Sequence, residues 1–275
     1  MTMTELAKRY ANRVGAAPSY LEQLIVLTKR LEWQAEDMTP DLIDSYLTQS
    51  LRHLAASTVD NHRRMLRSLL AFAAEERLVA KSILRPLRRV KRNPPSPRAW
   101  SHAEIIKLLD ACHGLPGRTL KCPLETLMPA WILTAYSTGL RLNDLLALRY
   151  DDIRGNRICV RQQKTGEPHV VFLDDNAMFA IRELPKCGPR IFGDLVGRSR
   201  ILVAMRKLVK RAGLNGSTKY LRRSGATYCE VHGIDASQHL GHRSPGMKRF
   251  YVDRLLLAEE RPPQPVVPPI PLRAG

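Results

Sequence analysis

Apolar residues recur at helical spacing along most of the N-terminal third of the chain. The segments PSYLEQLIVLTKRLEW, TPDLIDSYL and STVDNHRRMLRSLLAFAAEERLV each carry one apolar stripe and a polar opposite face. Pro40 after Thr39 marks the start of the second segment. The other two begin with the spacing of capping boxes, Ser19–Glu22 and Ser57–Asp60. Residues 18–92 are therefore predicted to be helical.

A second group of elements begins at Ser101, which forms another capping-box pattern with Glu104. Residues 126–150 predict two helices interrupted at Gly139. The stretch RICVRQQKTGEPHVVFL predicts a β-hairpin around a TGEP turn. Helical patterns then resume in SRILVAMRKLVKRAG, STKYLRRSGATYCEVHG and SPGMKRFYVDRLLLAEE. The pattern predicts a mainly α fold in two domains, with a small β-hairpin or sheet in the second.

Prolines and basic residues separate the two helical groups. Between Lys81 and Arg98 there are seven basic residues, four prolines and no acid, a composition typical of an extended basic linker. The expected order is a helical domain, a basic linker, a second domain and a proline-rich tail: residues 1–92, 93–100, 101–260 and 261–275.

The charge of the chain narrows its class of partner. Lys and Arg number 44 against 26 Asp and Glu, a formal net charge of +18. Such an excess favours a polyanionic partner, with nucleic acid first and an anionic membrane second. No apolar run approaches the ~20 residues that span a bilayer. The five scattered cysteines suit reduced thiols in a cytosol, so we expect a cytoplasmic DNA-binding protein without a membrane segment.

Four short segments of the second domain carry candidate chemistry. They are TGLRLND with Arg141 and Asp144, the hairpin turn with Lys164, KYLRRSGAT with Lys219 and Arg222, and HLGHRSPGMKRFYV with His242 and Tyr251. Each segment alone has an ordinary structural explanation, such as a surface cation, a turn lysine or a half-buried aromatic residue. The pair His239 and His242 has metal-ligand spacing but no convincing third ligand. Arg141 stands at a helix start, where the backbone dipole favours an anion.

In this order and spacing the four segments resemble the tyrosine recombinases, the phage integrase family of site-specific DNA recombinases. The resemblance covers roughly residues 100–257, and the N-terminal helices look like the DNA-clamping domain of that family. Lys219 stands where the family usually has histidine, and Arg223 replaces another histidine. The segment 227–240 is about one helical turn shorter than is usual in the family. These departures concern positioning and rate more than the type of reaction.

The resemblance implies cleavage and rejoining of DNA through a covalent 3′-phosphotyrosine intermediate, with no metal and no ATP. The implied catalytic residues are Arg141, Lys164, Lys219, Arg222, His242 and the nucleophile Tyr251, with Asp144 in support. Stabilising the negative charge of the phosphate does not require a metal ion, because two arginine side chains can bind its non-bridging oxygens.

The implied partner is double-stranded DNA, bound by a homotetramer on paired sites that exchanges the helix after Tyr251. A cytoplasmic, nucleoid-associated protein of a prokaryote or phage is expected. Candidate DNA-binding residues lie on the third helical segment and in the basic stretch: Arg63, Arg64, Arg67, Arg88, Arg89, Lys91 and Arg92. A solvated basic face explains the first three equally well. Two alternatives remain, a topoisomerase-like nicking and closing enzyme and a DNA-binding relative with impaired catalysis.

Overall fold

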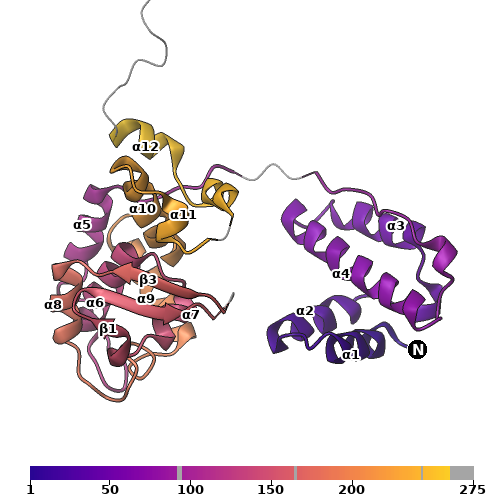
Figure 1. Ribbon diagram of the computed structural model, residues 1–275, viewed down its shortest axis with the longest axis horizontal. Helices are drawn as coiled ribbons and strands as arrows, with labels where there is room; N and C mark the ends of the chain where they lie inside the picture. The colour runs from indigo at the N-terminus through magenta and orange to yellow at the C-terminus, as the bar shows by residue number, and fades with distance from the viewer. Residues whose placement is uncertain (92–94, 164–165, 243, 261–275) are drawn as a thin grey trace, which may run out of the picture. The chain divides into compact units, whose positions relative to one another are not determined.

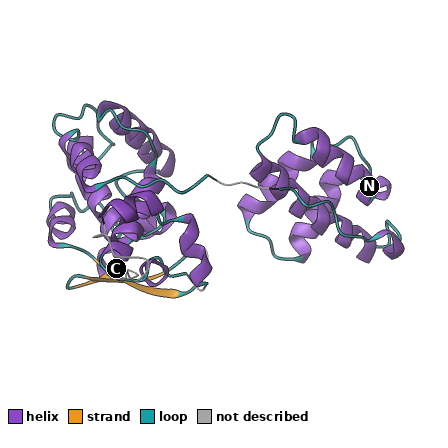
Figure 2. Ribbon diagram, turned by 90° about the horizontal axis from the view of Figure 1, so that it is seen from above, coloured by secondary structure: helices purple, strands orange, loops and turns teal. Residues whose placement is uncertain are grey.

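The computed structural model describes residues 1–91, 95–163, 166–242 and 244–260. The chain forms two compact units, Met1–Pro94 and Pro95–Gly275. Among the described residues, the β-strands belong to the second unit, and the first is built of helices and loops (Figure 2). The mainly α fold with one small sheet that the sequence predicts is confirmed.

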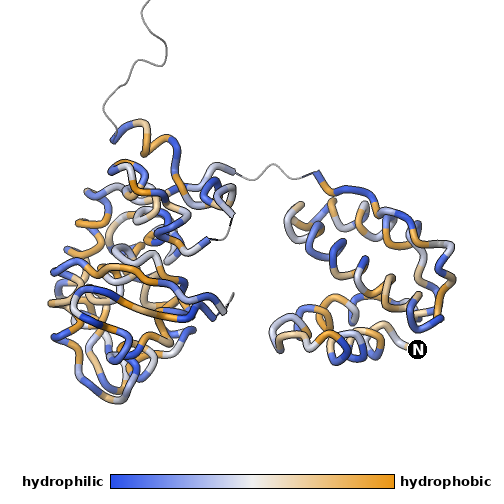
Figure 3. The backbone as a smooth tube through the Cα atoms, in the orientation of Figure 1, coloured by the Kyte–Doolittle hydropathy of each residue, from blue (hydrophilic) through white to orange (hydrophobic). Residues whose placement is uncertain are grey.

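Among its described residues, the first unit is built of packed α-helices (Figure 1). They are α1 (Met3–Arg13), α2 (Pro18–Thr28), α3 (Pro40–Ser50) and α4 (Ala56–Glu75), with 3₁₀ turns η1 (Ala35–Asp37) and η2 (Lys81–Ile83). Helix α1 packs against α2 and α4, and α3 packs against α4. Leu6, Leu24 and Leu66 are fully buried between these helices. Along α4 hydrophobic and hydrophilic residues alternate within the turns, as expected of a helix with one buried face (Figure 3).

Local capping explains two of the helix starts. Helix α1 begins with a capping box between Thr2 and Glu5. Helix α3 begins as predicted, with Pro40 at the first helical position and the Thr39 hydroxyl accepting from the Leu42 amide at 3.2 Å.

The predicted capping boxes at Ser19 and Ser57 are wrong. Helix α2 begins two residues earlier than predicted, because Pro18 has a preset φ and no N–H and so suits the first helical position. Helix α4 begins at Ala56, also without a side-chain cap. The Asp60 carboxylate instead pairs with two arginines on the following turn of α4, both at 3.0 Å.

The second unit contains the remaining elements. The helices are α5 (His102–Asp110), α6 (Leu124–Thr138), α7 (Leu142–Ala147), α8 (Asp175–Arg182), α9 (Arg198–Arg211), α10 (Thr218–Val231), α11 (Ala236–His239) and α12 (Arg254–Glu260). The 3₁₀ turns are η3 (Tyr150–Asp152) and η4 (Pro245–Phe250), and the strands are β1 (Ile153–Arg154), β2 (Arg157–Arg161) and β3 (Pro168–Phe172).

Helix α6 lies at the centre of the second unit. It contacts α5, α8, α10 and β3, and its Trp131 is 1% exposed. The strands form an antiparallel sheet in the order β1-β2-β3, and the paired Ile158 and Val171 turn inward to the same core. At the start of the unit the Ser101–Glu104 capping box is confirmed. The sheet and α6 thus form the scaffold on which the candidate site is built.

Candidate active site

The loop after α6 directs Arg141 toward the hairpin. Gly139 ends α6 with φ = 59°, in the left-handed region that glycine adopts without strain. Arg141 then stands at the N-cap of α7, as the predicted helix break requires. Its side chain is 22% exposed. Its Nη1 donates to Oε1 of Gln162, in the residue that follows β2, at 2.6 Å.

Asp144 links α7 to the same hairpin. This carboxylate lies in the first turn of α7, where the helix dipole favours an anion, and the residue is buried. Its Oδ1 accepts from the backbone N–H of Gln163 at 3.0 Å, and its Oδ2 lies 3.9 Å from Nη1 of Arg141. The buried acid therefore compensates part of the Arg141 charge and suits an orienting role.

Arg222 is a buried cation on the second turn of α10. It is 7% exposed. Its Nη1 donates to the carbonyl of Gly139, and its Nη2 donates to the carbonyl of Leu240 at 3.2 Å. Burial lowers the pKa of Arg222 to about 10, and the neighbouring Tyr251 partly offsets this effect. The guanidinium group is therefore still charged at neutral pH, but it lacks the hydration of an exposed cation.

Tyr251 and His242 meet Arg222 from the C-terminal segment. The Arg222 guanidinium carbon lies 5.0 Å from the centre of the Tyr251 ring. The His242 ring centre is 4.9 Å from that of Tyr251, and its Nε2 is 3.1 Å from Nη2 of Arg222. Each of these three residues, which are separate in sequence, therefore contacts the other two.

The single helix predicted across Tyr251 is wrong. The 3₁₀ turn η4 ends at Phe250, Tyr251 follows in a turn, and α12 begins only at Arg254. The cause is Asp253, whose Oδ1 accepts from the first amides of α12. Its Oδ2 accepts from the Ala99 amide at 2.9 Å. These bonds hold Asp253 outside the helix, so Tyr251 lies on a non-helical turn beside α10.

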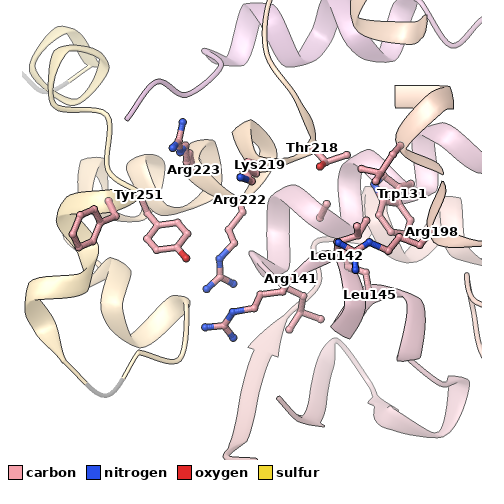
Figure 4. Close-up of a pocket in the computed structure, with 14 residues that line it drawn as sticks. Trp131, Arg141, Leu142, Leu145, Arg198, Thr218, Lys219, Arg222, Arg223 and Tyr251 are labelled. Carbon is pink, nitrogen blue, oxygen red and sulfur yellow. The ribbon is translucent and has the colours of Figure 1, made fainter. Parts of the chain in front are cut away.

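Lys219 lies near these residues on the first turn of α10. A cavity of about 600 Å³ is lined by Arg141, Lys219, Arg222, Arg223 and Tyr251, among others. In Figure 4 the Tyr251 hydroxyl and the guanidinium groups of Arg141 and Arg222 converge from three segments of the chain. Arg198 also lines this cavity, so five cations and a phenol surround it and form a site for an anion. Arg223 and the apolar walls of this cavity were not among the predicted site residues.

The hairpin that should carry the candidate lysine forms as predicted. Strands β2 and β3 pair in antiparallel register from Arg157–Phe172 to Arg161–Pro168. Lys164 itself falls outside the described residues, so its predicted role stays a prediction.

The candidate DNA-binding residues of the first unit differ in whether their charge is free to meet a phosphate or is already paired with an acid. Arg63 and Arg64 both pair with Asp60, and the Arg63 side chain is 18% exposed. Part of the charge on this face is therefore neutralised within α4. Four other cations are exposed to solvent: Arg67, Arg88, Arg89 and Lys91. Arg92 falls outside the described residues.

The basic stretch after α4 is anchored before it reaches the second unit. Leu87 is buried in the core of the first unit. Arg85 forms ion pairs with Asp41 at 2.6 Å and Asp44 at 3.0 Å. The exposed cations at 88, 89 and 91 therefore follow a fixed segment of chain.

Sequence reasoning missed two buried residues behind the site. Gln162 is 1% exposed and contacts Arg141. The Nε2 of His169 is 3.1 Å from the carbonyl of His239. Their signal was the alternation of the hairpin, which places both side chains on its buried face. The partners they contact could not be read from that pattern.

The histidine pair at metal-ligand spacing has a structural explanation. Burial, aided by the Arg222 charge, lowers the pKa of His239 to about 4, so the imidazole is neutral at pH 7. A Cβ at Gly139 would lie 2.7 Å from its Nε2, so the ring fills the space that this glycine leaves. Within the described residues, no group of three or more His, Cys, Asp or Glu side chains is arranged to hold a metal ion.

None of the described helices is long and apolar enough to cross a bilayer.

The sequence matches the profile of the Phage integrase family over residues 99–255, more than half of the chain. The chain belongs to this family. Its members are DNA strand-transferring enzymes, and the matched residues include the whole cluster around the cavity. Membership confirms the resemblance that the four short segments carry.

Individual relatives are distant. Tyrosine recombinase XerA of Saccharolobus solfataricus is 26% identical over 183 residues, which span 64% of this chain and 58% of the relative. Tyrosine recombinase XerD of Ralstonia nicotianae is 25% identical over 252 residues, 82% of this chain and 80% of the relative.

A solved lambda integrase fragment, a dimer bound to a COC′ core site, superposes with a TM-score of 0.74. It is 22% identical and covers 92% of this chain and 96% of its own. At this identity the likeness establishes the fold.

Proposed function

We propose that this protein is a site-specific DNA recombinase that cleaves and rejoins DNA through a covalent 3′-phosphotyrosine at Tyr251. One observation carries the proposal: Arg141, Arg222 and Tyr251 line one cavity, with His242 in contact with the last two. Membership in the Phage integrase family supports the same assignment.

The two arginines suit a phosphodiester in its transition state. Attack on phosphorus increases the negative charge on the non-bridging oxygens, so catalysis depends on positioning and on fixed positive charge. Arg141 and Arg222 offer planar forks that are held in place by the hydrogen bonds they donate to fixed elements. Because burial has removed most of the water around Arg222, an arriving phosphate oxygen meets a poorly hydrated cation.

The proposed step exchanges one phosphoester bond for another. The phenolic oxygen of Tyr251 bonds to phosphorus, and the bond from phosphorus to the 5′ oxygen breaks. The phenolic proton passes to a base, and we assign this role to His242, whose ring centre lies 4.9 Å from that of Tyr251. The 5′ oxygen takes a proton from a general acid, and we assign this role to Lys164, with Lys219 as the second candidate. Attack by a new 5′ hydroxyl reverses the sequence without ATP.

The assembly proposed is a tetramer on paired duplex sites, in which the first unit and its exposed cations hold the DNA. A solved lambda integrase tetramer bound to a Holliday junction supports this assembly, with a TM-score of 0.71. In the single chain α12 packs on its own unit, since Leu256 is buried beside Ala99 and Tyr228. Exchange of α12 between protomers therefore requires these contacts to be released and remade. We expect the protein to act at the nucleoid in the cytoplasm.

Trapping a covalent adduct tests the proposal. Duplex DNA nicked near the cleavage position loses the short 5′-hydroxyl fragment, so religation stops and the adduct accumulates. The wild type should form a protein–DNA band resistant to detergent, and Tyr251→Phe should bind the DNA with similar affinity and form none. An adduct of unchanged yield in Tyr251→Phe would show that another nucleophile acts, and Tyr228 or Tyr220 would be tested next.

Two further assays separate the alternatives. A topoisomerase-like enzyme relaxes supercoils without exchanging strands between two marked duplexes, whereas a recombinase exchanges them. A DNA-binding relative with impaired catalysis shifts the DNA in a gel and yields no adduct under any condition.

A further inference from the structure

Gln162 connects both catalytic arginines through one buried side chain. Its Oε1 accepts from Nη1 of Arg141 at 2.6 Å. Its Nε2 donates to the Leu240 carbonyl at 3.2 Å, and the same carbonyl accepts from Nη2 of Arg222 at 3.2 Å. The amide therefore joins Arg141 to a carbonyl oxygen that Arg222 also uses. Gln162 is 1% exposed, so water does not compete for these bonds.

The backbone of Gln162 belongs to the hairpin turn. Its N–H donates to the Glu167 carbonyl at 2.9 Å, and its carbonyl accepts from the Gly166 amide at 2.8 Å. The conformation of the hairpin and the position of the Arg141 guanidinium group are thus set at the same residue. Asp144, which accepts from the next amide of the hairpin, makes a second connection between these elements.

The segment before His242 leaves room for this amide. Gly241 has φ = 62°, and a Cβ there would lie 2.4 Å from Nε2 of Gln162. A side chain at this position would displace the amide from the Leu240 carbonyl. The close approach fixes the Gln162 amide against the loop that leads to His242.

We propose that Gln162 is a positioning residue that holds the Arg141 fork in register with Arg222. This inference rests on the proposed function. Arg141 is a long side chain with many rotamers, and its charge is useful only where the phosphate oxygens develop charge. A misplacement of about 1 Å can slow a reaction about 10²-fold, so we expect Gln162 to affect the rate of cleavage more than the affinity for DNA.

A double-mutant cycle tests the proposal. Gln162→Met keeps the length of the side chain and removes both hydrogen bonds. The Leu240 carbonyl keeps its bond from Arg222. In single-turnover cleavage of nicked DNA, Gln162→Met should slow adduct formation about 10- to 100-fold. The dissociation constant for DNA should change less than about threefold, within ordinary additivity error. Gln163→Met, whose side chain is exposed on the same hairpin, is the matched control and should cleave normally.

The decisive comparison uses the Arg141→Ala background. If Gln162 acts through Arg141, adding Gln162→Met there should slow cleavage no further than about threefold. The inference would be overturned if Gln162→Met slowed cleavage in the Arg141→Ala variant as much as it does in the wild type. It would also be overturned if Gln162→Met alone cleaved at the wild-type rate. If Gln162→Met fails to fold, Gln162→Glu is the second variant. Glutamate has the shape of glutamine and keeps an oxygen that accepts from Arg141, but its carboxylate neutralises the charge of Arg141. The penalty of Gln162→Glu should likewise vanish with Arg141→Ala. Failure of the wild type to form any adduct would instead refute the proposed function.

Discussion

Replacing Arg222 by methionine should separate the chemical role of this cation from its structural cost. Burial lowers its pKa from 12.5 to about 10. At about 1.4 kcal/mol per pKa unit, the folded protein holds the charged form at a cost of about 3 kcal/mol. Both pKa values lie far above 7, so this cost is fully present at neutral pH and is relieved only above pH 10.

The hydrogen bonds of Arg222 offset much of that cost. Arg222→Met leaves the buried Gly139 carbonyl without the guanidinium donor, a loss of about 1–3 kcal/mol. The Leu240 carbonyl keeps its bond from Gln162. Relief of the buried charge and loss of the bonds nearly cancel, so we expect the free energy of unfolding to change by less than about 2 kcal/mol.

The loss of the Arg222 cation from the active site is not offset by any gain in catalysis. By analogy with removal of one oxyanion donor, Arg222→Met should slow cleavage by a factor of about 10²–10³. The two measurements are urea unfolding of the free protein and single-turnover adduct formation at saturating enzyme. Arg206→Met removes one exposed cation of α9 and is the control for loss of net charge. Cleavage at the wild-type rate, or a loss of more than about 4 kcal/mol of stability, would refute this account of Arg222.

Three further predictions concern salt, the general acid and pH. Alanine at the exposed residues Arg88, Arg89 and Lys91 should reduce the slope of log affinity for DNA against log salt by about 3, and an unchanged slope would exclude them from the interface. Lys164→Ala should cleave normal DNA slowly and recover on DNA with sulfur at the 5′ bridging position, because a thiolate leaves without a proton. Failure of sulfur to rescue would make Lys219 the better candidate for the acid. The folded pKa of His239, about 4, lies below its ordinary value of 6.5, so the unfolded state takes up the proton first. Stability should therefore fall as pH falls from about 6.5 to 4, and equal acid sensitivity of His239→Gln would contradict this cause.

Local signals predicted the parts of the fold that depend on neighbouring residues. The break at Gly139, the cap at Ser101 and the pairing of β2 with β3 all follow from turn and capping chemistry within a few positions. The proximity of Arg141, Arg222 and Tyr251 came from a family resemblance, since no periodicity relates residues so far apart in sequence.

The errors and omissions arose where a distant contact decides the outcome. Asp253 ends the turn at Tyr251 partly through the Ala99 amide, which is 154 positions away, so helical spacing alone predicted a continuous helix. Gln162 looked like an ordinary hairpin residue. Its importance depends on Leu240, 78 positions later, and on the absence of a side chain at Gly241.

The most direct test of the central claim is to identify the atom that carries the DNA. The adduct trapped on nicked duplex is digested with nuclease and protease, and the modified peptide is sequenced by mass spectrometry. We predict a nucleotide joined by its 3′ phosphate to the phenolic oxygen of Tyr251, and a free 5′ hydroxyl on the released strand. A nucleotide on any other residue, or cleavage that leaves a 3′ hydroxyl and a 5′ phosphate, would contradict the account.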